Sequence, residues 1–423
     1  MEQTLTFKIG TRSQQVSLPA EALLGVLEPN AVEVPAAGEE EQVRAALARP
    51  IGSPRLREIV RPGETVAIVT SDITRPMPTW KALPALLDEL YAGGVRREDV
   101  TLVFALGSHR GHSEEEKRHL AGDRAWAEIA CADLNPADCV HVGVTSRGTP
   151  VDIDRRVAEA DRRVLLGNIE YHYFAGYSGG AKAIMPGVST REAIQANHSR
   201  MVQPEAHAGK LEGNPVREDI EEAAAMVGVD FILNVVLDAR KNIIRAVAGD
   251  VTAAHRAGCA FLDTLYRVPI PRRADIVLVS QGGAPKDLNL YQTQKALDNA
   301  RHAVRPGGVI VLIGSCAEGL GEKTFEEWMT TAPTAHSLID RIRREFRLGG
   351  HKAAAIAMVL EDADIYLVSD LEDALVERLF MKPFHSVQEA YDAAVKKCGP
   401  GASVLAMPYG GSTLPALEEV PQG

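Results

Sequence analysis

Cysteine is scarce in this sequence, and the cysteines present do not have the spacing of a metal site. The 423 residues include only five, which stand far apart: Cys131, Cys139, Cys259, Cys316 and Cys398. An odd and scattered set of this kind excludes a disulfide framework and favours a reducing compartment. The chain has neither a CxxC pair nor an HExxH motif, so a conventional zinc site has no support.

Long apolar runs and an excess of positive charge are also missing. No stretch reaches the ~18 apolar residues of a membrane span. The start at Met1 has neither the basic nor the apolar region of a signal peptide, so we expect a cytoplasmic protein. The formal net charge is -11 and the pI is near 5.6, which argues against a nucleic-acid surface. We therefore expect neither nucleic acid nor a membrane as a partner.

What the sequence does contain is an alternation of strand-like and helix-like segments. Short β-branched runs suited to buried parallel strands alternate with segments of helical spacing. The expected strands are 65–70, 100–106, 163–167, 231–237, 276–280, 309–314 and 365–369. The expected helices are 80–92, 190–201, 251–266, 290–304, 351–360 and 387–397. This alternation predicts an α/β protein with mostly parallel sheets and helices on both faces.

A Pro-rich basic segment at 267–273 is typical of a linker between domains. A second α/β run follows it, and the length of the chain allows two or three domains. We therefore expect two α/β domains, residues 1–266 and 267–404, with the tail 405–423 returning to the first. An active-site cleft is expected between them, since ligands usually bind where domains meet.

Three loops that follow expected strands carry reactive side chains, and such loops lie at the carboxyl edge of the sheet, where open α/β folds bind ligands. The segment SDITRP at 71–76 offers the carboxylate of Asp72 and the guanidinium of Arg75, which suits bidentate capture of a carboxylate or phosphate. An Asp/Thr turn before a helix would look the same. The segment ALGSHR at 105–110 places His109 directly behind a strand, either as a general base or as a mere helix cap.

A glycine-rich segment at 168–187 surrounds a single lysine, Lys182. Glycine lets the backbone approach a phosphate or a planar cofactor closely. Lys182 could hold a phosphate or form a covalent bond to a cofactor. The segment is not a P-loop, because Ala183 follows the lysine, and it does not fit G-x-G-x-x-G either. An ordinary nucleotide-binding label is therefore not supported.

Further polar residues allow both a functional and a plain structural interpretation. His198, on the next expected helix, is either a metal ligand or a structural histidine. Gln292 and Lys295 are spaced i, i+3 and share a helix face, which suits a carboxylate at a helix N-terminus but also fits a solvated surface. His112 and His119 belong to a charged helical segment, and we expect both to be solvated surface residues.

Taken together and in this order, these motifs resemble the nickel-pincer lactate racemase family. The segments that carry the resemblance are SDITRP at 71–76, ALGSHR at 105–110, EYHYFAGYSGGAKAIMPG at 170–187, NH at 197–198 and GGAPKDLNLYQTQKAL at 282–297. The resemblance covers nearly the whole chain, and the joint match is far more specific than any one segment. It implies an isomerase that interconverts the D- and L-enantiomers of a small 2-hydroxy acid, lactate or a close homologue.

The resemblance also implies a cofactor and a role for each site residue. Family members bind nickel in the nickel-pincer nucleotide, a pyridinium-3-thioamide-5-thiocarboxylic acid mononucleotide, so cofactor-building enzymes are implied partners. By resemblance, His109 and His172 are the acid/base pair and His198 is the nickel ligand. The cofactor would be tethered to the chain through a thioamide at Lys182. The remaining implied roles are cofactor binding by Asp72, Gly179 and Gly180, and substrate carboxylate binding by Arg75, Gln292 and Lys295.

Reversible hydride transfer explains why two histidines are implied. The α-proton beside a carboxylate is weakly acidic, so hydride transfer avoids a carbanion, and each enantiomer needs its own base for the hydroxyl proton. Two other functions remain open. One is an NAD-dependent 2-hydroxy acid dehydrogenase, which needs a dinucleotide fingerprint that the chain lacks. The other is a non-catalytic nucleotide-cofactor-binding protein, against which two candidate bases and a carboxylate-binding set argue.

Overall fold

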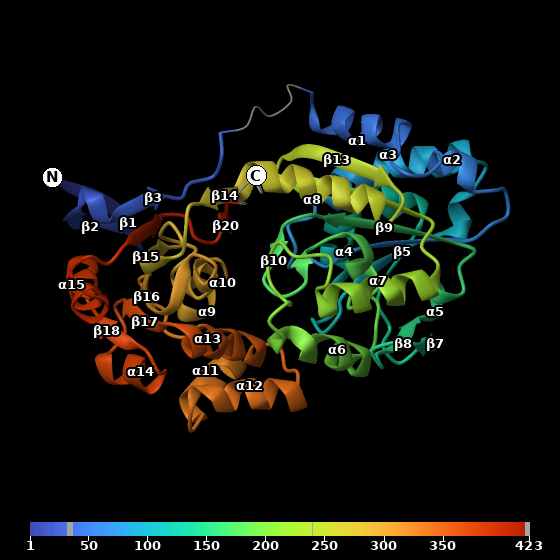
Figure 1. The fold of residues 1–423 in the computed structure, drawn as a ribbon. Helices are drawn as coiled ribbons and strands as arrows, with labels where there is room; N and C mark the ends of the chain where they lie inside the picture. The colour runs from blue at the N-terminus through green and yellow to red at the C-terminus, as the bar shows by residue number, and fades with distance from the viewer. Residues whose placement is uncertain (32–36, 239, 419–423) are drawn as a thin grey trace. The chain divides into compact units, whose positions relative to one another are not determined.

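The computed structural model describes residues 1–31, 37–238 and 240–418 and divides the chain into two compact units. One unit comprises Val32–Asp263, and the other joins Met1–Ala31 to Thr264–Gly423. Figure 1 traces the chain through both by colour. Each unit contains a six-stranded, mostly parallel sheet, which confirms the predicted α/β class.

The sheet of the Val32–Asp263 unit has the strand order β13-β12-β9-β4-β5-β6. All neighbours are parallel except β12 and β13, which pair antiparallel. The continuous buried run in β4 is what a parallel sheet covered on both faces requires. The strands are β4 (Val66–Ser71), β5 (Val100–Ala105), β6 (Ala130–Asp133), β9 (Arg162–Asn168), β12 (Phe231–Leu237) and β13 (Ile243–Gly249).

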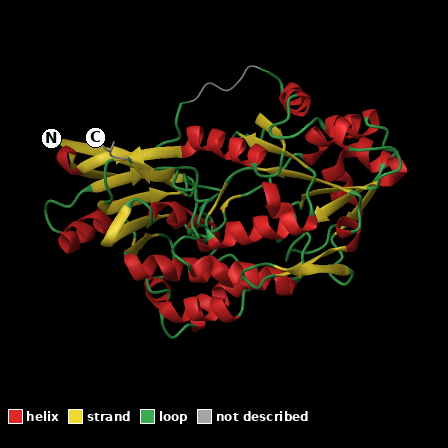
Figure 2. Cartoon of the chain, turned by 45° about the vertical axis from the view of Figure 1, so that its right-hand side comes forward, coloured by secondary structure: helices red, strands yellow, loops and turns green. Residues whose placement is uncertain are grey.

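Helices cover both faces of this sheet, and Figure 2 shows strands and helices in layers. One face shares its core with α1 (Glu39–Ala48), α2 (Leu56–Ile59), α3 (Thr79–Ala92) and α4 (Glu114–Glu128). Two further elements pack on β4, namely α5 (Arg155–Ala158) and η3 (Gly180–Ala183). Helix α7 (Pro215–Val227) packs on η3. The remaining elements are η2 (Arg97–Asp99), β7 (Cys139–Val144), β8 (Pro150–Asp154), β10 (Tyr171–His172), β11 (Gly176–Tyr177), α6 (Arg191–His198), η4 (Ser199–Val202) and α8 (Ala253–Tyr266).

The sheet of the other unit is parallel throughout, in the order β18-β17-β16-β15-β19-β3. Its strands are β3 (Leu23–Val26), β15 (Ala274–Ser280), β16 (Val304–Ile313), β17 (Asp364–Val368), β18 (Lys382–Phe384) and β19 (Val404–Met407). The hairpin of β1 (Glu2–Ile9) and β2 (Arg12–Pro19) shares a core with this sheet and α15 (Val387–Cys398). The other elements are η1 (Ala20–Ala22), β14 (Arg267–Ile270), α9 (Leu290–Thr293), α10 (Lys295–Ala300), α11 (Lys323–Thr331), α12 (Ala335–Arg344), α13 (Gly350–Asp362), α14 (Asp373–Arg378) and β20 (Leu414–Leu417).

The two units differ from the expected division at both ends of the chain. Residues 1–31 were expected in the first domain, but β3 pairs with β19 and the β1–β2 hairpin packs on the same sheet. The expected linker begins with a strand, because β14 pairs with β20. That pairing keeps the tail with this unit through Leu417, and residues 419–423 lie outside the described residues.

The expected helix at 290–304 is also different. It is divided at Gln294 into α9 and α10, and it ends at Ala300 because Val304 already pairs with Ala274 at the start of β16. All five cysteines are free thiols. Within the described residues, no helix combines the length and the apolar character needed to span a membrane.

Candidate active site

Three loops at one edge of the Val32–Asp263 sheet carry most of the candidate residues. Because β9, β4 and β5 are parallel neighbours, the loops that follow them leave from the same edge. The backbone N–H of Gly107 donates to the carbonyl of Gly187 at 2.9 Å, so the loop after β5 touches the end of the glycine-rich segment. In chain order, the loops carry Asp72, Arg75, His109, His172 and Lys182.

Asp72 and His109 form a pair at this edge. The carboxylate of Asp72, 3% exposed, accepts hydrogen bonds from the backbone N–H and hydroxyl of Thr74 at 2.8 and 2.5 Å. Its other oxygen contacts Nδ1 of His109. Burial raises the pKa of Asp72, but the hydrogen bond and charge of His109, with Thr74, outweigh it and lower the pKa. An ionised Asp72 keeps the proton of His109 on Nδ1, which leaves the Nε2 lone pair as the base.

His112, expected to be a solvated surface residue, is instead buried and holds the loop that carries Asp72. Its side chain is 1% exposed and packs edge-on against Phe104 at 5.4 Å. Nδ1 contacts a carboxylate oxygen of Asp133 at 2.6 Å, and Nε2 accepts from the backbone N–H of Ile73 at 3.1 Å. The expectation was wrong because His112 precedes α4 instead of lying on its charged face. His119 is exposed, as predicted.

Phe174 brings three candidate residues together around one ring. The ring centroids of His172 and His198 lie 4.5 and 4.9 Å from its centroid, and Nζ of Lys182 lies 5.8 Å from it. Phe174 itself is buried. The ring of Phe174 is therefore the common neighbour of three residues from separate elements: a candidate acid/base, a lysine and a candidate metal ligand. Sequence reasoning missed Phe174, since a buried phenylalanine carries no signal that separates it from the core.

The hydrogen bonds of His198 fix which nitrogen of its ring carries the proton. Asp219, fully buried, accepts from Nδ2 of Asn197 at 2.7 Å, so the amide oxygen of Asn197 faces His198. That oxygen lies 2.7 Å from Nδ1 of His198, which must donate to it. Nε2 of His198 therefore holds the lone pair. This is the arrangement of a metal-binding histidine, whose other nitrogen is held by a hydrogen bond.

The hydrogen bonds of His172 favour the opposite tautomer to that of His198. Its Nδ1 accepts the backbone N–H of Ala175 at 3.2 Å, so the neutral ring carries its proton on Nε2. His109, in contrast, has its proton on Nδ1. One histidine is thus set to accept a proton at Nε2 and the other to donate from it. That difference suits two groups of which one takes a proton while the other gives one.

Lys182 lies on η3 with a half-buried side chain. Burial, followed by the positive charges of Arg217 and Arg75, holds the pKa of Lys182 well below its ordinary value, and Glu170 opposes this only in part. A lowered pKa increases the fraction of neutral amine, which is the nucleophilic form. Lys182 is therefore suited to covalent bond formation.

Gly179 and Gly180 are held in conformations that glycine adopts easily. Both have positive φ, and an added Cβ would lie 2.7 Å from Oδ1 of Asn234 at Gly179 and 2.8 Å from the ring of His255 at Gly180. Oδ1 of Asn234 accepts from the N–H of Gly180 at 2.7 Å. Its Nδ2 is buried and has no hydrogen-bond partner among the described residues, so a donor is available beside the glycines.

Gln292 and Lys295 belong to the other unit, on α9 and α10. Although the helix is divided between them, Nζ of Lys295 donates to Oε1 of Gln292 at 2.5 Å, so the two side chains do lie together. The same helix α10 carries Asp298, which pairs with Nζ of Lys352 at 3.1 Å; both of these side chains are almost entirely buried. Sequence reasoning did not find that ion pair.

The donor set limits how a metal could be held. Within the described ranges, no group of three or more His, Cys, Asp or Glu side chains could hold a metal ion. A metal at His198 would therefore need most of its ligands from a bound organic group. The amine of Lys182, whose pKa is lowered, and the unpartnered amide nitrogen of Asn234 fit a covalently held cofactor with polar substituents. These residues thus fit a tethered metal-carrying cofactor better than a bare metal ion.

Known proteins match this chain along most of its length. The model of the lactate racemase N-terminal domain matches residues 9–209, and that of the lactate racemase C-terminal domain matches residues 270–414. A lactate racemase from Thermoanaerobacterium thermosaccharolyticum is 33% identical over 408 residues, which cover 94% of this chain and 95% of the relative. One from Lactiplantibacillus plantarum is 32% identical over 382 residues, 88% of this chain and 90% of the relative.

Solved structures agree with these matches. The lactate racemase apoprotein from T. thermosaccharolyticum aligns with a TM-score of 0.87 at 31% identity, covering 99% of this chain and 100% of that one. A protein from Thermotoga maritima shares the fold, with a TM-score of 0.62 at 18% identity over 92% of this chain and 100% of that one. Since both domain models and relatives of 32–33% identity span most of the chain, it belongs to the lactate racemase family.

Proposed function

We propose that this chain racemises lactate or a close 2-hydroxy acid homologue with a nickel-pincer nucleotide bound at Lys182. The observation that carries the proposal is the meeting of His172, Lys182 and His198 around Phe174. The lactate racemases among its relatives support the reaction and the substrate class.

The proposed cofactor would be held by residues of the Val32–Asp263 unit. When bound, the cofactor would supply nickel and the capacity for reversible hydride transfer with C2 of the substrate. Lys182 would provide the amine nitrogen of the thioamide tether, and Nε2 of His198 would bind the nickel. Gly179 and Gly180 would border the cofactor, with Asn234 as a nearby hydrogen-bond donor and Asp72 acting through His109.

The side chains of the protein would move the hydroxyl proton and hold the carboxylate. His109, supported by the carboxylate of Asp72, would take the hydroxyl proton of one enantiomer through Nε2. His172 would donate a proton from Nε2 to the oxygen of the opposite enantiomer, and the two histidines would exchange roles for the reverse reaction. Arg75 would bind the carboxylate by charge-assisted hydrogen bonds and so retain the 2-keto acid. That Gln292 and Lys295 also bind the carboxylate stays a prediction from the sequence.

The proposal is tested by following optical rotation without NAD. Protein made together with the cofactor-building enzymes should convert either pure enantiomer of lactate to the racemic mixture, with no net 2-keto acid. Malate and longer 2-hydroxy acids, tried separately, define the substrate range. Strict dependence on NAD with accumulating keto acid would favour a dehydrogenase, and cofactor binding without any turnover would favour a binding protein.

Asn197→Leu should weaken nickel binding, because Nδ1 of His198 then loses the acceptor that fixes its proton. Loss of such a supporting hydrogen bond typically costs about 10- to 100-fold in metal affinity. Nickel content of the purified, cofactor-loaded protein measures the effect, with thermal unfolding followed in parallel. Normal nickel content in a stable Asn197→Leu protein would mean that His198 is not the ligand.

A further inference from the structure

Arg217, the third residue of α7, is buried without a close carboxylate partner. The residue is 0% exposed, and Nη1 has no hydrogen-bond partner among the described residues. The carboxylate of Glu221 lies 4.0 Å from Nε and pairs instead with Arg256 at 2.7 Å. Burial lowers the pKa of Arg217 to about 10, so it remains charged at neutral pH. A buried charge whose nearest carboxylate lies 4.0 Å away costs stability, which points to a function for it.

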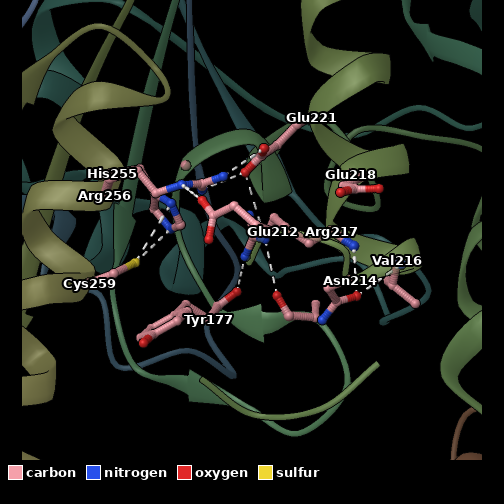
Figure 3. Close-up of polar contacts among 12 residues, drawn as sticks. Tyr177, Glu212, Asn214, Val216, Arg217, Glu218, Glu221, His255, Arg256 and Cys259 are labelled. Carbon is pink, nitrogen blue, oxygen red and sulfur yellow. Dashed lines mark hydrogen bonds and ion pairs between the residues drawn. The ribbon is translucent and has the colours of Figure 1, made fainter. Parts of the chain in front are cut away.

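The guanidinium fixes the backbone of the glycine-rich segment. Each carbonyl of residues 174–177 accepts a hydrogen bond from the segment 209–217, and Arg217 donates two of these bonds. Figure 3 shows Arg217 and Asn214 at the start of α7, with Arg217 reaching the Tyr177 carbonyl. The donors and acceptors are Asn214 Nδ2 to Phe174 O at 2.9 Å, Arg217 Nε to Ala175 O at 3.1 Å, Gly209 N to Gly176 O at 3.0 Å, and Arg217 Nη2 to Tyr177 O.

The helix α8 supports the same segment from its other side. Nε2 of His255 donates to the carbonyl of Ser178 at 2.8 Å, and its ring lies against Gly180. Burial and the charge of Arg217 hold the pKa of His255 well below its ordinary value, so this ring is neutral. Figure 3 shows His255 and Cys259 on one helix near Arg217. The backbone that leads into η3 is thus held by one charged group and one neutral group.

The charge of Arg217 also acts on Lys182. Helix α7 packs on η3, which carries Lys182, and Arg217 has the largest effect of any charged group on that amine. Of the other groups that face Lys182, Arg75 acts in the same direction from an exposed loop, Glu170 opposes both, and His255 is neutral. A buried charge is screened far less by water and salt than an exposed one. We therefore expect the pKa of Lys182 to depend more on Arg217 than on Arg75.

We propose that Arg217 is a positioning residue for bond formation at Lys182: it fixes the backbone before η3 and keeps a buried positive charge on the helix that packs against η3. The inference deepens the proposed function, since it concerns the nucleophile that would hold the cofactor. It does not need the cofactor to be present, because Arg217 acts on the lysine before any bond forms.

The test is acylation of Lys182 by acetic anhydride in the full chain made without cofactor-building enzymes. The amine lone pair attacks the anhydride carbonyl, an N–C bond forms, acetate leaves and the amine proton goes to solvent. Peptide mass spectrometry gives the rate for Lys182 relative to exposed Lys241, from mildly acidic to alkaline pH. In Arg217→Met, acylation at neutral pH should slow about tenfold or more, and the pH profile should move to higher pH.

Matched variants distinguish the effect of the Arg217 charge on acylation from an effect of the substitution on folding. Arg217→Lys keeps the charge and should change the pH profile less than Arg217→Met. Cys259→Asp places a carboxylate near Arg217 without removing its hydrogen bonds, so it should slow acylation, whereas Cys259→Asn should not. Arg75→Met should have a smaller effect that disappears at high salt, because Arg75 is exposed.

The outcomes of the acylation test are distinct from those of the racemisation test of the proposed function. Equal Lys182 profiles in folded Arg217→Met and wild-type protein would overturn the inference. If Arg217→Met does not fold, equal rates in Cys259→Asp and Cys259→Asn would overturn it in the same way. A cofactor-loaded protein that fails to racemise 2-hydroxy acids would refute the proposed function, but it would leave the acylation result unchanged.

Discussion

Replacing Lys182 with alanine should remove the covalent adduct and reduce racemisation by at least about a hundredfold. The alanine has no amine to form the tether, so the cofactor and its nickel would be lost on purification. Intact mass, nickel analysis and turnover of protein made with the cofactor-building enzymes measure the three effects together. In the wild-type protein, the mass adduct should map to the peptide that contains Lys182.

Lys182→Arg is the matched control for charge. It retains a cation but not a nucleophilic amine, so it should lose the adduct as completely as Lys182→Ala. Unfolding temperature should stay close to that of wild-type protein made without cofactor. An Ala variant that keeps nickel and full turnover would show that the attachment site is elsewhere.

His109→Gln should lower turnover about 10²- to 10⁴-fold, the usual contribution of a general acid or base. Asp72→Asn should have an effect in the same direction, because an amide no longer holds the proton on Nδ1 of His109 and no longer stabilises its charged form. Nickel content should remain near normal in both, since neither residue is proposed as a metal ligand. Steady-state kinetics with each enantiomer, combined with nickel analysis, separates these effects.

Asp133→Asn provides a control for the Asp72 result. It alters another Asp–His contact in the same unit, at His112, which supports the loop by hydrogen bonding to Ile73. Because Asp133 acts only on the structure of the loop, Asp133→Asn should reduce activity less than Asp72→Asn does. If Asp72→Asn and Asp133→Asn lose activity equally, or if His109→Gln turns over normally, the assignment of His109 as the base is refuted.

The sequence predicted the position of the main loops because parallel strands impose it. The buried run of β4 predicts a strand whose loop must emerge at the carboxyl edge, and β5 and β9 follow the same rule. This rule predicts Asp72, His109 and Lys182 at one sheet edge. The roles of these residues remain proposals.

The features that the sequence did not predict depend on contacts between segments that lie far apart in the chain. Strand β3 joins β19 only through pairing across almost the whole chain, and no local pattern near residue 23 indicates that partner. Arg217 looks like a surface residue of an amphipathic helix until its hydrogen bonds to the carbonyls of Ala175 and Tyr177 are seen. Asn214 caps α7 and Pro215 is its first residue, but this local pattern does not indicate which carbonyls the first helix turn binds.

The most direct test of the account follows deuterium during racemisation. L-lactate deuterated at C2 is incubated in ordinary water with the cofactor-loaded protein and without NAD, and the D-lactate formed is analysed by mass spectrometry. If hydrogen leaves and returns as hydride, the optical rotation should fall to zero while the product keeps its deuterium. Unchanged rotation, or D-lactate in which the deuterium has been replaced by hydrogen from water, would contradict the account.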